Sequence, residues 1–182
     1  MDKIVIPLAE GMEEIEAVTP IDVLRRAGLE VKTCYVGESS RVTGDHEIII
    51  EADSNIKDLQ ANKVGGLVLP GGIPGATNLK NSKELIKLIK AVDKDGGLLA
   101  ANCAAPIVLE AAGVLKDRQA TSYPGFDEQM PSCIYQEERV VIDGNVITAR
   151  GPGVALEFSL ALVEYLLDEG AAKNLQQKMM AN

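Results

Sequence analysis

The chain has 182 residues, a formal net charge of −9 and an aromatic content of only 3%, with no tryptophan. A chain of this length can bury a continuous core without disulfides or a structural metal, so we expect one domain spanning residues 1–182. The negative charge repels phosphate backbones, and no basic cluster with interleaved aromatics offsets it, which argues against nucleic acid as a partner.

The cysteines and the start of the chain bear on the cellular compartment. Cys34, Cys103 and Cys133 are odd in number and lack C-x-x-C spacing, which predicts free thiols rather than a disulfide framework or a zinc site. Residues 1–6 run directly into a short apolar strand without the features of a signal peptide. No apolar run is long enough to span a bilayer. We therefore expect a cytoplasmic protein with no membrane partner.

The chain opens with a strand and a helix. Residues 3–8 form a continuous apolar run that predicts a buried strand. From Glu13 the apolar residues have helical spacing, and this pattern closes at Ala27 and Gly28. Pro20 falls inside the predicted helix, where it should cause a kink or cost a hydrogen bond.

A second strand and a hairpin follow. Residues 29–36 are predicted as the next strand. Residues 42–43 and 48–50 flank Gly44 and Asp45, a dipeptide suited to a tight hairpin turn. We expect an antiparallel feature at the side of the main sheet.

The middle of the chain repeats the alternation of strand and helix. Residues 64–69 are a buried strand that leads into a loop rich in proline and glycine, and a helix is predicted over residues 82–94. Residues 98–102 are a further buried strand that leads without a spacer into a helix over residues 106–112.

The last third completes this pattern with strands and helices. Strands alternating with helices predict parallel βαβ units, so the expected fold class is α/β, a doubly wound, mostly parallel sheet with helices on both faces. The remaining predicted elements are strands at residues 119–122, 139–142 and 146–150, and helices at residues 154–167 and 171–180.

In an open α/β sheet, ligands bind outside the carboxyl ends of the strands. Three loops of unusual composition lie there, at residues 10–16, 70–75 and 102–106. We therefore expect the functional residues to come from these loops.

Cys103 occupies the most distinctive of these positions. Its strand must reverse sharply into a helix, and small residues flank it on both sides, as in a nucleophile elbow. A helix N-terminus would lower the thiol pKa from about 8.5 toward about 3.5–7.5, which predicts a thiolate at neutral pH. The alternative is an ordinary buried cysteine that acts as a small hydrophobic residue.

Two further features favour a reactive site. Gly71 and Gly72 follow a buried strand and would let backbone N–H groups approach an oxyanion, although a plain turn has the same composition. Glu16 lies in an apolar context on the inner turn of the first helix, and burial beside a thiolate would raise its pKa so that it carries a proton at pH 7. For Glu13 and Glu14 we expect a solvated acidic helix start.

Five segments together resemble the ThiJ/PfpI superfamily, and within it the Parkinson-disease protein deglycase family. The likeness covers nearly the whole chain in order and spacing. The segments are AEGMEEIE at residues 9–16, LRRAG at 24–28, VLPGG at 68–72, NCAAP at 102–106 and TARGPG at 148–153.

The resemblance implies a flavodoxin-like homodimer without a cofactor or metal. It places Cys103 at the reactive cysteine and Glu16 at its protonated partner, with Gly72 and the backbone N–H of Ala104 as oxyanion donors. In that family the cysteine attacks 2-oxoaldehydes such as methylglyoxal or glyoxal and forms a hemithioacetal, which rearranges to a 2-hydroxy acid without glutathione. Family members are also described as repairing glycated proteins, as oxidation sensors and as chaperones.

The sequence departs from the family pattern at two positions. Ala104 stands where protease-like branches carry a histidine, so a Cys-His hydrolytic triad lacks its second member and a protease is not expected. Tyr123 replaces a histidine of the nearest animal relatives; it can hydrogen-bond a substrate but is a poor base at pH 7. His46, the only histidine, is expected to be a surface residue.

Two functions remain open at this point. One is an enzyme that converts 2-oxoaldehydes or their early protein adducts; the other is a stress sensor or chaperone that works by oxidation of Cys103. No phosphate loop supports a role in thiazole phosphate synthesis. Cys34 and Cys133 have no assigned role beyond secondary oxidation. Met12, Ile15 and residues 24–26 could form a twofold contact, as the resemblance suggests, or merely pack on the sheet.

Overall fold

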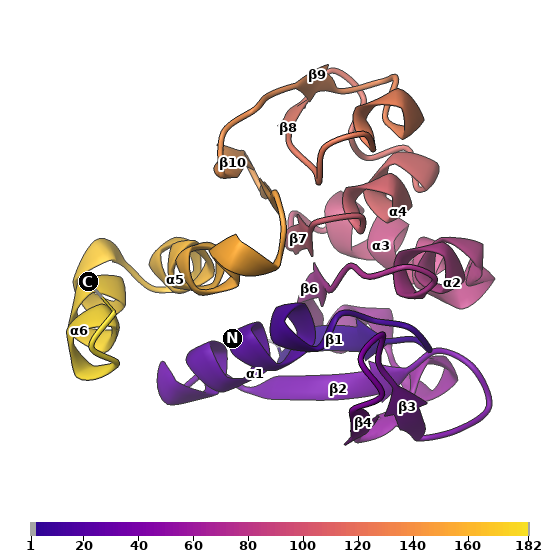
Figure 1. Ribbon diagram of the computed structural model, residues 1–182, viewed down its shortest axis with the longest axis horizontal. Helices are drawn as coiled ribbons and strands as arrows, with labels where there is room; N and C mark the ends of the chain where they lie inside the picture. Colours follow the sequence, from indigo (N-terminus) through magenta and orange to yellow (C-terminus); the bar gives the residue numbers. More distant parts are fainter. Residues whose placement is uncertain (1–2, 182) are drawn as a thin grey trace.

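The computed structural model describes residues 3–181 and has a seven-stranded sheet at its centre (Figure 1). The strand order is β10-β11-β7-β6-β1-β2-β5, and all neighbours are parallel except β10 and β11. The predicted α/β, flavodoxin-like fold class is confirmed. The strands are β1 (Lys3–Leu8), β2 (Val31–Tyr35), β5 (Ser54–Asn55), β6 (Val64–Leu69), β7 (Leu98–Asn102), β10 (Val140–Asp143) and β11 (Val146–Ala149).

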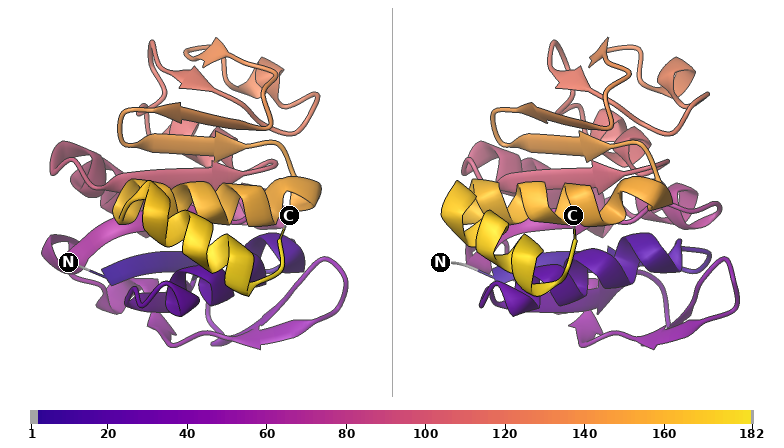
Figure 2. Two further views of the ribbon diagram at one scale, coloured as in Figure 1. Left: turned by 90° about the vertical axis from the view of Figure 1, so that its left-hand side faces the viewer. Right: turned by 60° about the vertical axis from the view of Figure 1, so that its left-hand side comes forward.

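Helices cover both faces of this sheet, as Figures 1 and 2 show. Side chains alternate along each strand, so Val5 enters one apolar cluster while Ile4 and Ile6 enter the other. Both faces are therefore buried, as expected for parallel strands. One face carries α1 (Glu14–Arg26), α5 (Ala155–Leu166) and α6 (Glu169–Lys178), and the other carries α2 (Gly75–Asn81), α3 (Lys83–Lys94) and α4 (Pro106–Ala111).

The strand order fixes where a ligand would bind. From β1 the chain moves to β2 on one side, and β6 and β7 then lie on the other side. The order thus reverses between β1 and β6, and the loops at the carboxyl ends of strands at such a switch point form a crevice. The loops after β1, β6 and β7 are the three that the sequence singles out.

The predicted hairpin is present, but the prediction that it has a tight turn is wrong. The strands β3 (Arg41–Thr43) and β4 (Ile49–Glu51) pair antiparallel with Thr43 opposite Ile49, so residues 44–48 form a longer loop. The N–H of Asp45 donates to the carbonyl of Met12 at 2.8 Å. Because the segment after β1 holds this loop, the Gly44-Asp45 dipeptide does not have to close the turn alone.

Other local differences have similar causes. Pro20 does not interrupt α1, which runs unbroken and buries Pro20. The predicted loop after Gly75 is α2, and Ser82 then caps α3 by accepting the N–H of Leu85 at 3.2 Å. The strand predicted at residues 119–122 shortens to β8 (Gln119–Ala120), which pairs with an unpredicted β9 (Ile134–Tyr135) outside the main sheet. Short 3-10 turns occur at Ile56–Asp58, Ala61–Lys63, Asp127–Gln129 and Pro152–Val154.

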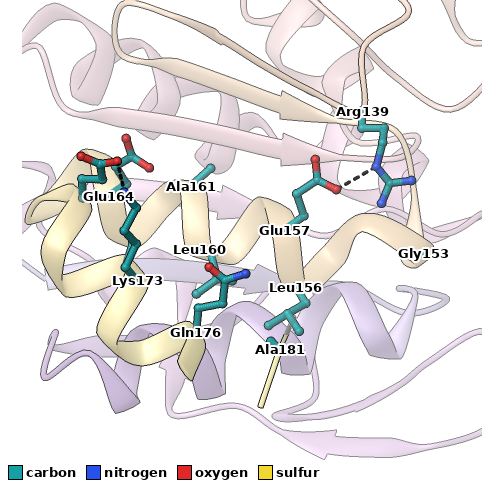
Figure 3. Close-up of a pocket in the computed structure, with 12 residues that line it drawn as sticks. Arg139, Gly153, Leu156, Glu157, Leu160, Ala161, Glu164, Lys173, Gln176 and Ala181 are labelled. Atoms are coloured by element: carbon teal, nitrogen blue, oxygen red, sulfur yellow. Dashed lines mark hydrogen bonds and ion pairs between the residues drawn. The ribbon is translucent and has the colours of Figure 1, made fainter. Parts of the chain in front are cut away.

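A surface hollow of about 620 Å³ lies between α5 and α6 (Figure 3). Its apolar floor includes Leu156 and Leu160, and its rim carries the ion pairs Arg139–Glu157 and Lys173–Glu169. None of the residues that line it comes from the three loops of the switch point. Among the described residues, no helix is both long and apolar enough to cross a membrane.

Candidate functional site

Cys103 lies half-buried at the turn between β7 and α4, with its backbone in the left-handed region at φ 60°. A non-glycine residue rarely adopts this conformation, which persists only where the surroundings enforce it. The N–H of Cys103 donates to Ala149 at 2.9 Å, and its carbonyl accepts the N–H of Tyr123 at 2.8 Å. These bonds hold the reversal that the nucleophile-elbow pattern predicts.

Two backbone N–H groups hydrogen-bond the sulfur of Cys103. They belong to Gly72 and Ala104, the two predicted oxyanion donors, and both lower the pKa of the thiol. The N–H groups at the start of α4 are otherwise engaged, since Ile107 donates to Ala104 at 3.3 Å and Val108 donates to Ala105 at 2.9 Å. The α4 helix has only six residues, so the sulfur interacts with individual N–H groups more than with a long helix dipole.

Glu16 is 1% exposed and reaches the same place from the first turn of α1. Its Oε2 accepts the N–H of Gly71 at 2.8 Å, and its carboxyl group also hydrogen-bonds the thiol of Cys103. Among the described residues, no N–H or O–H group reaches its Oε1. Burial raises the pKa of Glu16 to about 7, against the hydrogen bonds from Gly71 and Cys103, which lower it. At this pKa Glu16 can both hold and release a proton near neutral pH.

The prediction for the thiol itself is wrong. Burial, the negative charge of Glu16 and the hydrogen bond to Glu16 raise the pKa of Cys103 to about 12. The charge of Glu16 acts only after its proton has left near pH 7. The two groups therefore titrate as a pair that loses one proton near neutrality and the second far above it. Near neutral pH the pair therefore carries at most one negative charge, on the carboxyl group, and the thiol keeps its proton.

Gly71 permits this close contact. A Cβ atom at this position would lie 2.7 Å from Oε2 of Glu16 and 2.8 Å from Cβ of Cys103. Its carbonyl also accepts the N–H of Glu13 at 3.0 Å, which fixes the start of α1. The sequence left open whether the glycine pair forms a plain turn or lets the backbone approach a reactive centre. The geometry favours the close approach.

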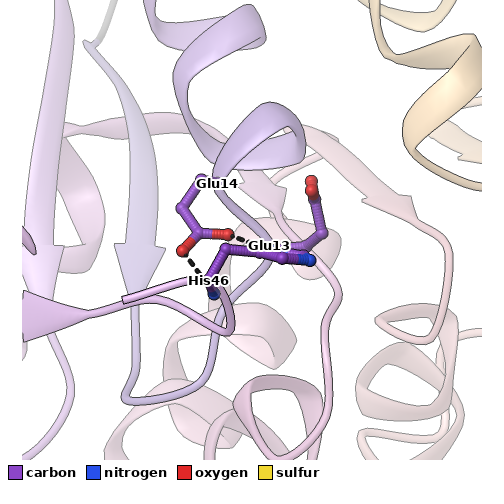
Figure 4. Close-up of side chains that lie close together, drawn as sticks. All are labelled: Glu13, Glu14 and His46. Atoms are coloured by element: carbon purple, nitrogen blue, oxygen red, sulfur yellow. Dashed lines mark hydrogen bonds and ion pairs between the residues drawn. The ribbon is translucent and has the colours of Figure 1, made fainter. Parts of the chain in front are cut away.

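The expectation for Glu13 and Glu14 is wrong, because they are only 9% and 5% exposed. Glu13 caps α1 by accepting the N–H of Glu16 at 2.7 Å. Glu14 accepts the N–H groups of His46 and Ile48 at 2.7 and 3.4 Å, and its other oxygen lies 2.9 Å from Nδ1 of His46 (Figure 4). These contacts, which join segments distant in sequence, remove the carboxylates from solvent.

His46 is exposed, as predicted, and its pairing with Glu14 raises its pKa. Glu13, Glu14 and His46 offer ligand atoms within 4.8 Å of one another, the only such group of metal-binding side chains within residues 3–181. The oxygens of Glu14 already accept hydrogen bonds, and Glu13 caps a helix. The cluster is therefore explained by its structural role, which is to attach the hairpin loop to α1.

Tyr123 is 47% exposed, and it lies beside the reactive turn. Its ring lies against Gly151, since a Cβ built there would meet Cδ2 of Tyr123 at 3.3 Å. The carbonyl of Gly151 accepts a bond from the fully buried side chain of Asn102 at 3.1 Å. The sequence analysis gives Asn102 no role. Its position directly before Cys103 is the one feature of the sequence that could have suggested that it supports the turn.

The other two cysteines lie outside this arrangement. Cys34 is buried in the core, which raises its pKa to about 12. Cys133 is half-buried, donates to the carbonyl of Met130 at 3.2 Å and has a raised pKa because of burial and the nearby Glu110. In the described part of the chain, no acid shifts the pKa of Cys34, and Glu110, the acid near Cys133, accepts the N–H and the hydroxyl of Ser132 at 3.2 and 2.7 Å.

Comparison with known proteins gives consistent results. Residues 2–165 match the model of the DJ-1/PfpI family. A solved structure of oxidized DJ-1 from Toxoplasma gondii superposes with a TM-score of 0.95 at 35% identity, covering 99% of this chain and 98% of that chain. The Parkinson disease protein 7 homolog of Danio rerio is 38% identical over 95% of this chain and 94% of its own length.

Two further relatives differ in length and in name. Protein DJ-1 homolog B of Arabidopsis thaliana is 44% identical over 93% of this chain, and the match spans only 39% of that protein. This chain thus spans less than half the length of the plant relative. A protein of Caenorhabditis elegans named as a glutathione-independent glyoxalase is 38% identical over 90% of this chain and 87% of its own length.

The raised pKa of Glu16 makes stability depend on pH. An unfolded glutamate loses its proton near 4.5, whereas folded Glu16 keeps its proton to about 7. Between these values the folded state binds more protons, so stability falls as pH rises, by about 3 kcal/mol. Urea unfolding at pH 5 and pH 7.5 should show this fall. Glu16→Gln should remove it, and an equal fall in that variant would contradict the assignment.

The tight packing at Gly71 gives a second prediction. Gly71→Ala should lower the free energy of unfolding by about 1–3 kcal/mol, because the new methyl group overlaps Glu16 and Cys103. It should also alter the rate at which iodoacetamide alkylates Cys103. Gly153→Ala is the matched control, since its Cβ meets nothing within 4 Å. If both variants unfold at the same urea concentration as the parent, the packing argument is wrong.

Proposed function

Since the chain belongs to the DJ-1/PfpI family, we propose that it is a glutathione-independent glyoxalase that acts on 2-oxoaldehydes or on their early adducts with proteins. The observation that carries the proposal is the contact between the thiol of Cys103 and a buried carboxyl group whose pKa is about 7. The residues proposed for catalysis are Cys103 and Glu16. Gly71, Gly72, Ala104 and Tyr123 are proposed to bind the substrate.

The first step is addition of the thiol to the aldehyde carbon. Ionised Glu16 accepts the thiol proton as the sulfur–carbon bond forms, and the electron pair of the carbonyl moves onto its oxygen. The N–H groups of Gly72 and Ala104 stabilise the negative oxygen. Protonated Glu16 then returns the proton to this oxygen, which completes the hemithioacetal.

The second step moves hydrogen between two carbon atoms. Glu16 removes the proton from the carbon that carries sulfur, and the neighbouring ketone becomes an enediol. Reprotonation at the neighbouring carbon yields a thioester of the 2-hydroxy acid. Water then hydrolyses the thioester and frees Cys103. One carbon is oxidised and its neighbour is reduced, so R–CO–CHO and water give R–CHOH–COOH without an external oxidant or cofactor.

Oxidation of Cys103 is the second candidate function. The N–H groups of Gly72 and Ala104 at the sulfur, together with the carboxyl group of Glu16, would also stabilise the oxygen atoms of a sulfinic acid. The half-buried position of Cys103 allows a small peroxide to reach it. A peptidase is not proposed, because Ala104 provides no imidazole beside the thiol.

We further propose that the protein is a homodimer. The predicted contact needs correction, because Met12 and Leu24 are fully buried in the core. The exposed apolar patch is formed by Ile15, Val18, Ile48 and Ile49. Glu14 accepts the N–H of Ile48 at 3.4 Å, which brings the hairpin part of the patch beside the α1 part. A second copy of the chain would cover such a patch.

A single cytoplasmic domain fits the same evidence. The two ends of the chain contribute to one sheet, since β1 and β11 are separated only by β6 and β7. The three free cysteines suit a reducing compartment. We therefore propose that residues 1–182 act as one domain in the cytoplasm.

Methylglyoxal turnover tests the proposed function. The purified protein should form lactate without glutathione, and Cys103→Ala should reduce the rate to the uncatalysed background. Glu16→Gln should lower kcat/KM by at least about 100-fold, because it can no longer transfer protons. Glu157→Gln is the control, since this exposed carboxylate pairs with Arg139 on α5.

Lactate formation no faster than with Cys103→Ala would refute the enzyme. If dilute peroxide then oxidised Cys103 in the parent and more weakly in Glu16→Gln, the sensor function would be favoured. Mass spectrometry of the peptide that contains Cys103 measures this oxidation.

Sedimentation velocity tests the dimer. The parent should sediment with the mass of two chains, and Val18→Glu should convert it to one chain, because a charge would be buried in the apolar contact. Ile142→Glu is the control, since Ile142 is exposed on β10, outside the patch. A parent that sediments as a monomer at micromolar concentration would contradict the proposal.

A further inference from the structure

Two exposed apolar side chains belong to loops that contact Cys103, and neither takes part in the proposed proton transfers. They are Tyr123 and Ile73, which are 47% and 49% exposed. They come from the loops after β8 and β6, so neither shares a loop with Cys103. Large apolar groups that remain exposed next to a reactive centre are candidates for substrate contact.

Tyr123 is tied to the elbow through its own backbone. Its N–H donates to the carbonyl of Cys103 at 2.8 Å, so Tyr123 cannot move away while the elbow is intact. Its ring lies against Gly151, which has no side chain to cover that face. The aromatic ring is thus fixed at the edge of the site with about half of its surface free.

Ile73 is tied to the sulfur through the residue that precedes it. It directly follows Gly72, whose N–H hydrogen-bonds the thiol of Cys103. Gly75 then anchors the loop by donating to the carbonyl of Gly11 at 3.0 Å. The backbone of Ile73 is therefore held next to the oxyanion donor, and its branched side chain is half-exposed.

The charges around the thiol complete the description. Within residues 3–181, Glu16 is the only charged side chain that shifts the pKa of Cys103, and its effect is that of a negative charge. Of the arginines nearest to Cys103 along the described chain, Arg118 pairs with Asp93 and Arg139 pairs with Glu157. A carboxylate or phosphate on the substrate would be repelled by ionised Glu16.

We propose that Tyr123 and Ile73 select the substituent R of the 2-oxoaldehyde R–CO–CHO, so that an uncharged aromatic or branched aliphatic group is preferred over a methyl group and over a group carrying a carboxylate. The inference rests on the proposed glyoxalase function. The aldehyde carbon meets Cys103, its oxygen meets the N–H groups of Gly72 and Ala104, and R lies between the two apolar side chains.

Competing substrates test this selection. kcat/KM is measured for phenylglyoxal, 4-carboxyphenylglyoxal and methylglyoxal with the parent, Tyr123→Ser, Tyr123→Phe and Ile73→Ser. Comparing ratios between variants cancels the intrinsic reactivity of each aldehyde. Tyr123→Ser and Ile73→Ser should each lower the ratio of phenylglyoxal to methylglyoxal about tenfold, the size expected for loss of one apolar contact.

Two further comparisons separate the contacts that are involved. Tyr123→Phe should keep the parent's ratio, because the ring and not the hydroxyl makes the contact. The parent should also use 4-carboxyphenylglyoxal at least about tenfold less well than phenylglyoxal. Tyr165→Ser is the control, because Tyr165 is also an exposed tyrosine but lies on α5. Its ratio should equal that of the parent.

The outcomes distinguish the two proposals. Turnover of all three aldehydes with ratios unchanged in Tyr123→Ser and Ile73→Ser would overturn the substituent selection and leave the glyoxalase intact. If Tyr123→Phe lowered the ratio of phenylglyoxal to methylglyoxal as much as Tyr123→Ser does, the apolar contact would be overturned, since the hydroxyl would then be responsible. No turnover of any aldehyde above Cys103→Ala would overturn both proposals. The substituted side chains are exposed, and urea unfolding verifies that each variant is folded.

Discussion

The site depends on the contact between a buried carboxyl group and a half-buried thiol, which together carry at most one negative charge near neutral pH. In the part of the chain that the structure describes, no cation shifts the pKa of Glu16, and its carboxyl group is held by the N–H of Gly71 and by the thiol of Cys103. A second negative charge at this place would have no partner and little solvent, so the pair keeps one proton over the physiological range. The protonation state of each partner therefore depends on that of the other. The reactivity of the sulfur depends on the carboxyl group as well as on the burial of the thiol.

Three separate loops create this contact, and the sheet brings them together. Glu16 follows β1, Gly71 follows β6 and Cys103 follows β7. Because these strands are adjacent and parallel, their carboxyl ends lie along one edge at about 5 Å per strand. A Cβ atom on Gly71 would lie between the side chains of Glu16 and Cys103 and would keep them apart. The absence of one lets α1 approach β7 across the intervening loop.

Much of this arrangement is predictable from the sequence, for identifiable reasons. The strands at residues 3–8, 64–69 and 98–102 have the predicted limits, because each is a continuous apolar run that ends at a glycine-rich or small-residue loop. Cys103 and Glu16 are found from local context combined with a family resemblance. The burial of Glu14 is not predictable, since it depends on N–H groups of the hairpin loop more than thirty residues away. The prediction of the thiol pKa fails for a related reason, because burial of the thiol and a carboxylate from α1 outweigh the N–H groups at the turn after Cys103.

The hydrogen bonds of the elbow also bear on how the protein is made. The backbone of Cys103 is completed by Ala149 and Tyr123, and Asn102 is fastened to Gly151. All three partners are synthesised after the cysteine, two of them more than forty residues later. During synthesis, Cys103 is therefore added to the chain long before the hydrogen bonds that shape its turn can form. During that interval the nascent chain carries an ordinary cysteine, and the reactive centre arises only when the last parallel strand has docked.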